Sequence, residues 1–584
     1  MSRLFATLAT IFRLARPYFF SEDRLAGRLL LGAVISIELM IVGINVMLNQ
    51  WNNRFYNALQ ERNWDTFVYE LGFFCVLASA YIVIAVYQLY LNQWLQIRWR
   101  RWMTRQYLDH WLAGGNHYRM QLLGDAADNP DQRIAEDIKQ FIDGGILPIG
   151  LGLLNAVVTL ASFVAILWTL SAGAPLHLFG TDWAIPGYLV WAALIYGAAG
   201  TALTHWIGRP LIRLNFRQQR FEADFRFNLV RVRENSEQIA LLHGEDADRQ
   251  RLLERFGQVV ANWLLIMQRT KRLTFFTAGY NQVSTVFPFI VASPAYFAGA
   301  IQLGGLMQTA SAFGSVQTAL SFFISTYRQI AEWRAVIARL EGFIVSVEKA
   351  KAAAATPPVI AVAARAGATS VEVEDLLVRL PQGTPLVALD ELTVSAGDHV
   401  LVTGPSGAGK STLFRAIAGV WPFGAGTIVV PAGAKLMTLP QRPYFPIGTL
   451  AAAISYPDQP ETFAADRLAE VVAAVGLGAL AARLMEEAHW NRMLSLGEQQ
   501  RLGIARAILQ APDFLFLDEA TAALDERAEA ELYRLLDQRL KGTAVVSIGH
   551  RSTLAAFHRR GLALVRDGDL YRIRAAGLAV PAAE

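Results

Sequence analysis

The sequence predicts an all-α membrane domain with six spanning helices, followed by a soluble α/β domain. Hydrophobic residues make up 53% of the 584 residues and charged residues only 17%, whereas soluble globular domains carry about 25% charged residues. The shortage of charge lies mainly before residue 345. After residue 368, short runs such as HVLVTG and FLFLDE alternate with helical stretches, which is typical of an α/β domain.

Long apolar segments predict the six spanning helices. A helix needs about 20 apolar residues to cross a membrane. One uncharged segment, 273–327, is too long for a single span, and the sequence AGAIQLGG at 298–305 divides it into two helices joined by a hairpin. The other four spans are predicted in 29–47, which only Glu38 interrupts, and in 71–97, 144–181 and 183–208.

Positive charge predicts the orientation of these helices. Arginine clusters at 98–105 and 209–220 follow the second and fourth spans, and the loops after the third and fifth spans contain no Lys or Arg. Because positive residues favour the cytoplasmic side, we expect both termini and the two long connections, 98–143 and 209–272, in the cytoplasm. We expect these connections to be helix pairs, and the N-terminal segment to be an amphipathic helix on the membrane surface.

Composition also sets the domain boundaries. The membrane domain is predicted over 1–345, and an alanine-rich stretch with a Pro-Pro pair, 346–368, is interpreted as a linker. The soluble domain is predicted over 369–575, with a disordered tail over 576–584. The net charge of +4 without a long basic run excludes a nucleic-acid partner. The single cysteine, Cys75, excludes an internal disulfide and a cysteine zinc site.

The sequence GPSGAGKST, which follows the apolar strand HVLV and precedes the helical run LFRAIAG, has the pattern and context of a P-loop. Its glycines let backbone N–H groups surround phosphate oxygens, and the next helix adds its positive N-terminus. Lys410 is expected to reach the β- and γ-phosphates, and Ser411 to bind Mg²⁺. The predicted phosphate-binding residues are Gly404, Pro405, Ser406, Gly407, Ala408, Gly409, Lys410, Ser411 and Thr412.

A second motif, FLFLDE at 514–519, predicts a buried strand that ends in two acidic residues. Asp518 is placed to hold Mg²⁺ at the end of this strand. Glu519 is placed to polarise the water that attacks the γ-phosphate. Together with the P-loop, this pair predicts ATP and Mg²⁺ as the bound groups.

Four further sequences resemble the remaining motifs of ATP-binding cassette proteins. LSLGEQQR (494–501) resembles the family signature and AALD (522–525) its D-loop, while Gln441 resembles the Q-loop glutamine and His550 the switch histidine. The resemblance implies an ATPase of the transporter type with an exporter-like (type IV) membrane fold. It also implies that Glu519, His550 and Gln441 are catalytic, that Gln441 is a further Mg²⁺ ligand, and that Ser495, Gly497, Glu498 and Asp525 bind nucleotide.

Two positions depart from the family pattern. Leu496 stands in the signature where the family usually has glycine, so the fit near the γ-phosphate is expected to differ. The segment LVRLPQGTPL (377–386) contains no aromatic residue to stack on adenine. We therefore predict weak selectivity for the base of the nucleotide.

One P-loop and one signature in each chain predict a homodimer. Ser495 and Gly497 precede a helix that begins near Glu498, which makes a second anion site. Because the P-loop already binds one face of the triphosphate, the signature is expected to meet the ATP of a partner chain. Two chains then enclose two nucleotides, closing on ATP and opening after hydrolysis.

The membrane domain resembles SbmA/BacA-type peptide uptake proteins and their ATPase-fused bacterial relatives. The segments that carry this likeness include NQWNNRFYNALQ (49–60) and YRMQLLGDAADNPDQRIAEDI (118–138). They also resemble peroxisomal fatty-acyl and lysosomal cobalamin half-transporters, which share WPFGAG (421–426). The first likeness implies import of peptides or other bulky solutes across the bacterial inner membrane. The second leaves an exporter, or a carrier of fatty-acyl or cobalamin-type cargo, as the alternative.

The candidates for a substrate cavity are Glu38, Trp51 and Tyr56. An acid within a span is costly in lipid, so Glu38 is expected either to line the cavity or to be hydrogen-bonded between helices. Trp51 and Tyr56 either stack on cargo or belong to an interfacial aromatic belt. A further alternative for the whole protein is an ATP-gated channel or regulator, against which the presence of both Glu519 and His550 argues.

Overall fold

The computed structural model describes residues 2–124, 129–173, 176–178, 181–183 and 185–577. It divides into two compact units. Unit 1 consists of Met1–Leu108 with Asn129–Phe343, and unit 2 consists of Asp109–Asp128 with Ile344–Glu584.

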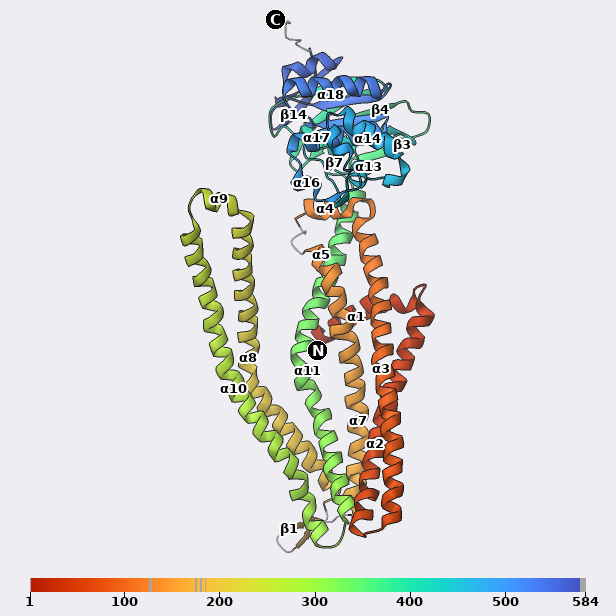
Figure 1. Cartoon of the computed structure of the whole chain (residues 1–584), viewed down its shortest axis with the longest axis vertical. Coiled ribbons are helices and arrows are strands. Elements are labelled where there is room, and N and C mark those ends of the chain that lie inside the picture. Colours follow the sequence, from red (N-terminus) through yellow and green to blue (C-terminus); the bar gives the residue numbers. More distant parts are fainter. Residues whose placement is uncertain (1, 125–128, 174–175, 179–180, 184, 578–584) are drawn as a thin grey trace. The chain divides into compact units, whose positions relative to one another are not determined.

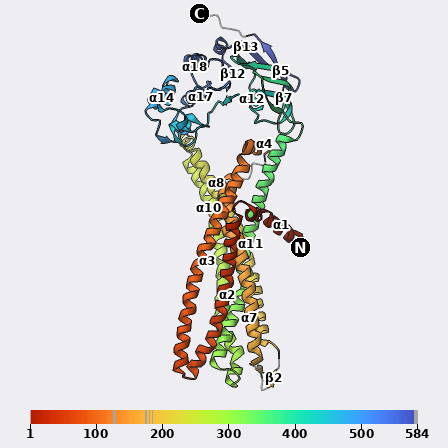
Figure 2. The same ribbon diagram turned by 90° about the vertical axis from the view of Figure 1, so that its right-hand side faces the viewer.

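Long helices make up unit 1. Among the described residues, six helices have 27 residues or more, and both views show them running along a common direction (Figure 1, Figure 2). They continue well beyond the apolar segments, as expected for the two long connections. The six are α2 (Arg24–Gln60), α3 (Trp64–Leu112), α7 (Leu147–Gly173), α8 (Tyr188–Glu234), α10 (Glu245–Phe297) and α11 (Leu303–Ala355).

Three stretches of the described residues are long and apolar enough to cross a membrane, namely Arg24–Gln60, Trp64–Leu122 and Pro130–Ala172. They contain the first two predicted spans and residues 144–172 of the third. The predicted spans in α8, α10 and α11 are not among them, because polar residues such as Thr, Ser, Asn and Gln interrupt their apolar segments. These three helices are nevertheless as long as the others.

Short elements connect the long helices of unit 1. A 3₁₀ turn and a bend precede α2, and two π-helical turns precede α7. The tip of the α8–α10 pair is the short helix α9, and Figure 1 shows this pair standing apart from the other helices of unit 1 near α9. The bounds are α1 (Ser2–Ala15), η1 (Tyr18–Phe20), α5 (Pro130–Gln132), η4 (Arg133–Asp137), α6 (Ile138–Phe141), η5 (Ile142–Ile146), β1 (Leu176–Leu178), β2 (Thr181–Trp183) and α9 (Ser236–Leu241).

Two kinds of contact hold α11 within unit 1. Apolar side chains of α7, α8 and α11 form a buried cluster that includes Phe163, Tyr188 and Phe313. Nearer the other end of α11, the buried carboxylate of Asp137 accepts hydrogen bonds from Arg133 at 2.8 Å and from Arg339 of α11 at 2.9 Å. This second contact joins the segment that follows residue 129 to α11.

A ten-stranded sheet forms the centre of unit 2, in the order β3-β7-β4-β5-β14-β13-β6-β12-β11-β8. Strands β13, β6, β12, β11 and β8 are parallel to their neighbours in that order. The strands are β3 (Ala361–Arg365), β4 (Ser370–Arg379), β5 (Pro385–Ser395), β6 (His399–Thr403), β7 (Gly424–Pro431), β8 (Leu436–Leu439), β11 (Phe514–Asp518), β12 (Ala544–Ile548), β13 (Arg560–Asp567) and β14 (Leu570–Ala576).

Two apolar clusters form the core of unit 2. One packs Phe414 of the helix after the P-loop against β4, β5 and β11, and includes Val387 and Phe516. The other packs most of the remaining helices against β11 and includes Leu502 and Leu532. The helices are α4 (Asn116–Leu122), α12 (Lys410–Ile417), α13 (Leu450–Ser455), α14 (Ala465–Ala474), α15 (Gly478–Ala481), α16 (Trp490–Met493), α17 (Leu496–Gln510) and α18 (Glu526–Arg539), with η6 (Pro460–Thr462), η7 (Ser552–Phe557) and the strand pair β9 (Gly448–Thr449) and β10 (Glu487–Ala488).

The stretch predicted as a linker, 346–368, contains regular structure. Helix α11 continues to Ala355, because alanine favours a helix, and β3 then pairs in parallel with β7. Helix α4, from the connection after α3, also belongs to unit 2, where Arg119 donates to the Ala350 carbonyl at 3.2 Å. Of the tail predicted to be disordered, residues 578–584 lie outside the described residues.

Candidate active site

Strand β6 leads into the P-loop, and α12 begins at its last residues. Gly404 and Gly409 have φ values of 145° and 91°, which favour glycine. Each also lacks room for a side chain, since a Cβ atom would lie 2.9 Å from Cβ of Leu564 at Gly404 and 2.6 Å from Cγ2 of Val387 at Gly409. The loop is therefore shaped by its glycines, and its N–H groups precede a helix N-terminus suited to an anion.

The amine of Lys410 is held inside this loop. Its Nζ donates to the carbonyl oxygens of Gly404 at 2.8 Å and Pro405 at 2.9 Å. Burial lowers the pKa of Lys410, against the attraction of the carboxylates of Glu519 and Asp518. A triphosphate would offer the amine stronger, charged acceptors in place of these carbonyls.

Ser411 and Asp518 meet at the end of β11. The Ser411 hydroxyl donates to Oδ1 of Asp518 at 2.7 Å, and burial raises the pKa of Asp518 although this hydrogen bond opposes the rise. Hydroxyl and carboxylate oxygens are ligands that suit Mg²⁺. Within the described part of the chain, no group of three or more His, Cys, Asp or Glu residues is placed to hold a metal. Ser411 and Asp518 would therefore supply two oxygen ligands to Mg²⁺.

Glu519 lies between the two other residues predicted to be catalytic. Its carboxylate accepts a hydrogen bond from Nε2 of Gln441 at 3.3 Å and lies 3.2 Å from Nε2 of His550. Its φ of 52° places the backbone in the left-handed region. Strained residues of this kind cluster at functional sites. The three side chains, which the sequence separates widely, can hold and orient a water molecule beside the P-loop.

Gln500 was not predicted from the sequence as part of the site. It is almost fully buried in α17, and its Nε2 donates to the carbonyl oxygens of Gln441 at 3.0 Å and Glu519 at 3.4 Å. Its Oε1 accepts from the N–H of Ala523 at 2.9 Å. This one side chain therefore ties the signature helix to three other motifs. Its signal in the sequence is the second of two adjacent glutamines within the signature LSLGEQQR, on the buried face of α17.

A buried carboxylate, Glu529, joins the segments that follow Glu519 and His550. It accepts hydrogen bonds from Thr521 at 2.6 Å and from Arg551 at 3.4 Å. Arg551 also donates to the Ala522 carbonyl at 3.2 Å. This link was not predicted from the sequence, because Glu529 and its partners Thr521 and Arg551 lie in separate segments.

The signature residues cap α17. The Ser495 hydroxyl accepts from the N–H of Glu498 at 3.3 Å, and the Glu498 carboxylate accepts from the N–H of Ser495 at 2.8 Å, forming a capping box. Leu496 and Gly497 are the first residues of α17. Asp525 likewise caps α18 by accepting from the N–H of Ala528 at 2.8 Å. In the single chain, Glu498 and Asp525 thus stabilise helix ends.

An aliphatic residue of the segment 377–386, Leu386, lies beside the P-loop. A Cβ atom on Gly409 would lie 2.8 Å from Cγ of Leu386, so Leu386 lies directly against the loop. The segment 377–386 contains no aromatic residue. The structure thus has the aliphatic side chain of Leu386, and no aromatic ring of this segment, against the P-loop.

The three cavity candidates lie at two places along α2. Glu38 is 7% exposed and accepts hydrogen bonds from Gln88 of α3 and from Asn155 of α7, the latter at 2.8 Å. Trp51 stacks on Phe55 and donates to the Glu70 carbonyl at 2.8 Å, while Tyr56 meets Phe55 edge to face. Thirteen residues of α2 separate Glu38 from Trp51, about 20 Å along a helix.

Comparison with known proteins matches both units. The family model for the ABC transporter transmembrane region 2 matches residues 14–297, and that for the ABC transporter matches 389–522. An ABC transporter ATP-binding protein of Haemophilus influenzae is 37% identical over 92% of this chain and 88% of its own length. The inner membrane ABC transporter ATP-binding protein YddA of Escherichia coli is 35% identical over 92% of this chain and 94% of its own length.

Two more distant likenesses extend this comparison. The human lysosomal cobalamin transporter ABCD4 is 26% identical over 82% of each chain. The structure of a bacterial Atm1-family ABC exporter with ATP bound matches with a TM-score of 0.67 at 18% identity, over 93% of this chain and 94% of the other. That likeness confirms the predicted fold, a helical transmembrane region followed by an α/β nucleotide-binding domain.

Proposed function

Since this chain belongs to the ABC transporter family, we propose that two copies of it hydrolyse ATP to move a bulky solute across the bacterial inner membrane. One observation carries the proposal: Glu519 lies within hydrogen-bonding distance of both Gln441 and His550, at the edge of the sheet where Ser411 meets Asp518. A chain that only bound nucleotide would not need this complete hydrolytic set.

The residues of the candidate active site have separate roles in ATP hydrolysis. Lys410 and the N–H groups of residues 404–412 hold the triphosphate, and Ser411, Asp518 and Gln441 would hold Mg²⁺, which neutralises phosphate charge when bound. Glu519 orients the attacking water and accepts its proton. His550 fixes the Glu519 carboxylate.

A second copy of the chain would complete the site. Each chain has one P-loop and one signature, and Ser495 is exposed at the start of α17. The tip of the α8–α10 pair also exposes apolar side chains, with Leu241 72% and Leu242 81% exposed. Exposed apolar side chains at a helix tip favour contact with another protein surface. Both features support a homodimer, with the two signatures facing the partners' nucleotides.

Peptides are the cargo we propose to test first, with import as the direction. The support is the likeness of 49–60 and 118–138 to SbmA/BacA-type uptake proteins. Cobalamin or fatty-acyl cargo is the second candidate, favoured by the similarity to a relative that is named a lysosomal cobalamin transporter. The orientation we propose places both termini and unit 2 in the cytoplasm.

Transport into vesicles tests these proposals. Purified protein is reconstituted, ATP is supplied on the side of unit 2, and labelled peptide, cobalamin or acyl-CoA is offered on either side. We expect accumulation of one cargo class with ATP, and none with Glu519→Gln. Equal flux through the wild type and this variant would indicate a channel. A monomer that hydrolyses ATP at the full rate would contradict the homodimer.

A further inference from the structure

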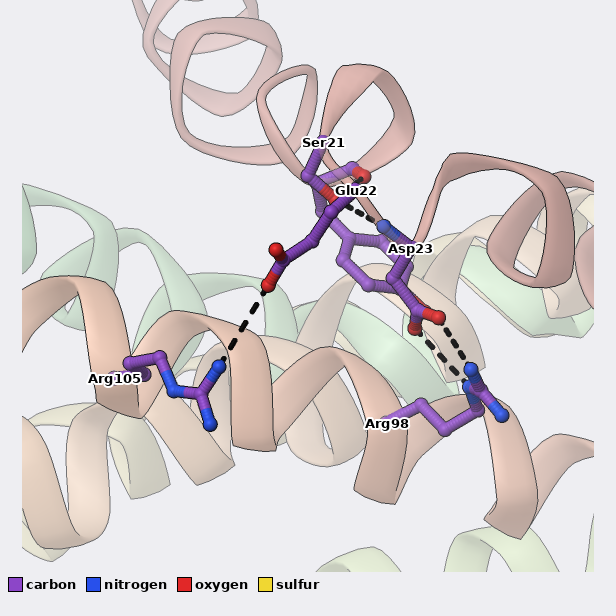
Figure 3. A network of polar contacts seen from close by, with 6 residues as sticks. Ser21, Glu22, Asp23, Arg98 and Arg105 are labelled. Atoms are coloured by element: carbon purple, nitrogen blue, oxygen red, sulfur yellow. Dashed lines mark hydrogen bonds and ion pairs between the residues drawn. The ribbon is translucent and has the colours of Figure 1, made fainter.

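A pocket of about 320 Å³ lies in unit 1 between α3 and the bend that precedes α2. Glu22 and Asp23 come from the bend, and the other lining residues come from α3. Figure 3 shows the two acidic side chains directed from the bend toward Arg105 and Arg98. The lining residues are Glu22, Asp23, Arg98, Arg101, Trp102 and Arg105.

The pocket lies where α3 leaves the apolar part of the membrane. Residues 71–97 of α3 carry no charge, and the pocket begins at the next residue, Arg98. Tyr107, further along α3, stacks on Phe343 of α11 at 5.3 Å, and α11 leads to the ATP-binding part of the chain. Trp102 in the pocket is typical of a membrane–water interface. The site is therefore at headgroup depth, in the leaflet that the arginine cluster at 98–105 indicates to be cytoplasmic.

The three arginines of the pocket differ in what they contact. Arg98 is fixed by Asp23, through Nε to Oδ2 at 3.1 Å and a second contact from Nη2. Arg105 lies 3.7 Å from Glu22, with both side chains mostly exposed. Arg101 makes no hydrogen bond or ion pair with any described residue. One arginine thus holds the bend in place, and two are available to an anion.

Arg101 and Arg105 lie on the same face of α3 as a row of exposed aromatic side chains. Residues 94, 98, 101 and 105 recur at intervals of four, three and four, so they lie along one face of α3. Toward the membrane, this face continues with Trp94 and Tyr87, which are 43% and 57% exposed. A ligand with a charged head and an apolar tail fits such a surface. A soluble anion would contact only the arginines and not the apolar side chains.

We propose that this pocket binds the phosphate headgroup of an anionic phospholipid. Arg101 and Arg105 hold the phosphate by charge-assisted hydrogen bonds, and Glu22 is displaced from Arg105. The acyl chains lie along Trp94 and Tyr87. The pocket has three arginines and two carboxylates, a net charge of +1, so Glu22 weakens the site that Arg101 and Arg105 form.

Lipid retention measured by native mass spectrometry tests this proposal. The full-length protein is released from nanodiscs that contain phosphatidylcholine and phosphatidylglycerol. We expect preferential retention of phosphatidylglycerol, and about thirtyfold weaker retention in Arg101→Gln/Arg105→Gln, the change expected for the loss of two arginines at an anionic surface. Glu22→Gln is expected to strengthen retention, which a purely structural role of these residues would not produce.

A matched control removes two exposed arginines elsewhere on a long helix. Arg220→Gln/Arg226→Gln changes the net charge equally but touches no residue of the pocket, so it is expected to retain the lipid as the wild type does. ATP hydrolysis by each variant verifies that it is folded. Equal loss in the control, unchanged retention in Arg101→Gln/Arg105→Gln, or displacement by inorganic phosphate at millimolar concentration would each overturn the proposal.

Discussion

Polar side chains converge on one point in unit 2, whereas in unit 1 they are distributed along the helices. Around Glu519, side chains from separate segments meet within hydrogen-bonding distance. In unit 1, Asp23, Glu38, Glu70 and Asp137 each have their own partners, on different helices and at different depths. The first arrangement suits a chemical step at a single place. The second suits contacts that hold separate helices together at several places along their length.

The largest effect is expected from Glu519→Gln. The amide cannot accept the proton of the attacking water, so the rate of ATP hydrolysis should fall by about 100-fold or more, while nucleotide binding persists. Phosphate release measures the rate of hydrolysis, and a fluorescent ATP analogue measures nucleotide binding. The control is Glu461→Gln, an exposed acid of unit 2. If hydrolysis survives in Glu519→Gln, the chemistry is not concentrated at this carboxylate.

Asp137→Asn is the corresponding change in unit 1. It removes the charge from a buried group that faces Arg133 and Arg339, and breaking a buried ion pair costs about 3–5 kcal/mol of unfolding free energy. We expect the thermal midpoint to fall with little change in ATP affinity. Asp131→Asn, an exposed change on the same segment, should have no such effect. A loss of ATP affinity without a change in stability would contradict this assignment.

Glu529→Gln tests a buried carboxylate that forms an ion pair with Arg551 close to the chemistry. The amide keeps a hydrogen bond from Thr521 but loses the charge that faces Arg551, whose segment also carries His550. We expect the maximal rate of hydrolysis to fall by about tenfold, with the KM for ATP nearly unchanged, because a charged hydrogen bond contributes about 1.5–3 kcal/mol. Steady-state kinetics at varied ATP concentration separate the two parameters. An increase in KM alone would show that Glu529 affects binding and not the catalytic step.

Glu38→Gln is expected to have a smaller effect, confined to unit 1. A glutamine cannot accept from both Gln88 and Asn155 as readily, so stability should fall by about 1 kcal/mol, while hydrolysis stays near the wild-type rate. Thermal denaturation and vesicle transport are measured on the same preparation. Loss of transport at unchanged stability would instead support a role in the cavity.

The smallest effect concerns the base of the nucleotide. Because Leu386 and not an aromatic ring lies against the P-loop, GTP should compete with ATP within about one order of magnitude of its affinity, since an aromatic stack contributes about 1–3 kcal/mol. Inhibition of ATP hydrolysis by GTP measures this directly. If GTP fails even at large excess, another residue selects the base.

The two units also differ in how far their structures follow from the sequence. In unit 2, short motifs predict that Lys410, Ser411 and Asp518 follow buried strands, because a P-loop and a buried strand are local structures, and in the structure Ser411 is hydrogen-bonded to Asp518. Gln500 and Glu529 were missed, because what they contact depends on packing between distant segments. The alanine-rich stretch was interpreted as a linker although alanine extends α11.

In unit 1, the sequence predicts the helices but not the contacts between them. Apolar length identifies α2, α3 and α7. Nothing local indicates that Asp137 meets Arg339, 202 residues away, or that Glu38 meets Asn155, 117 residues away. The proposed lipid pocket is of the same kind, since it needs Glu22 and Arg105 to be brought together in space.

The left-handed backbone at Glu519 has a consequence for how this protein responds to selection. With a φ of 52°, glycine or asparagine would be accommodated there more readily than glutamate. If residue 519 is varied in a library that is screened only for heat resistance, the selected proteins would therefore be more stable but inactive. Tolerance of heat and turnover of ATP make opposite demands on a single residue.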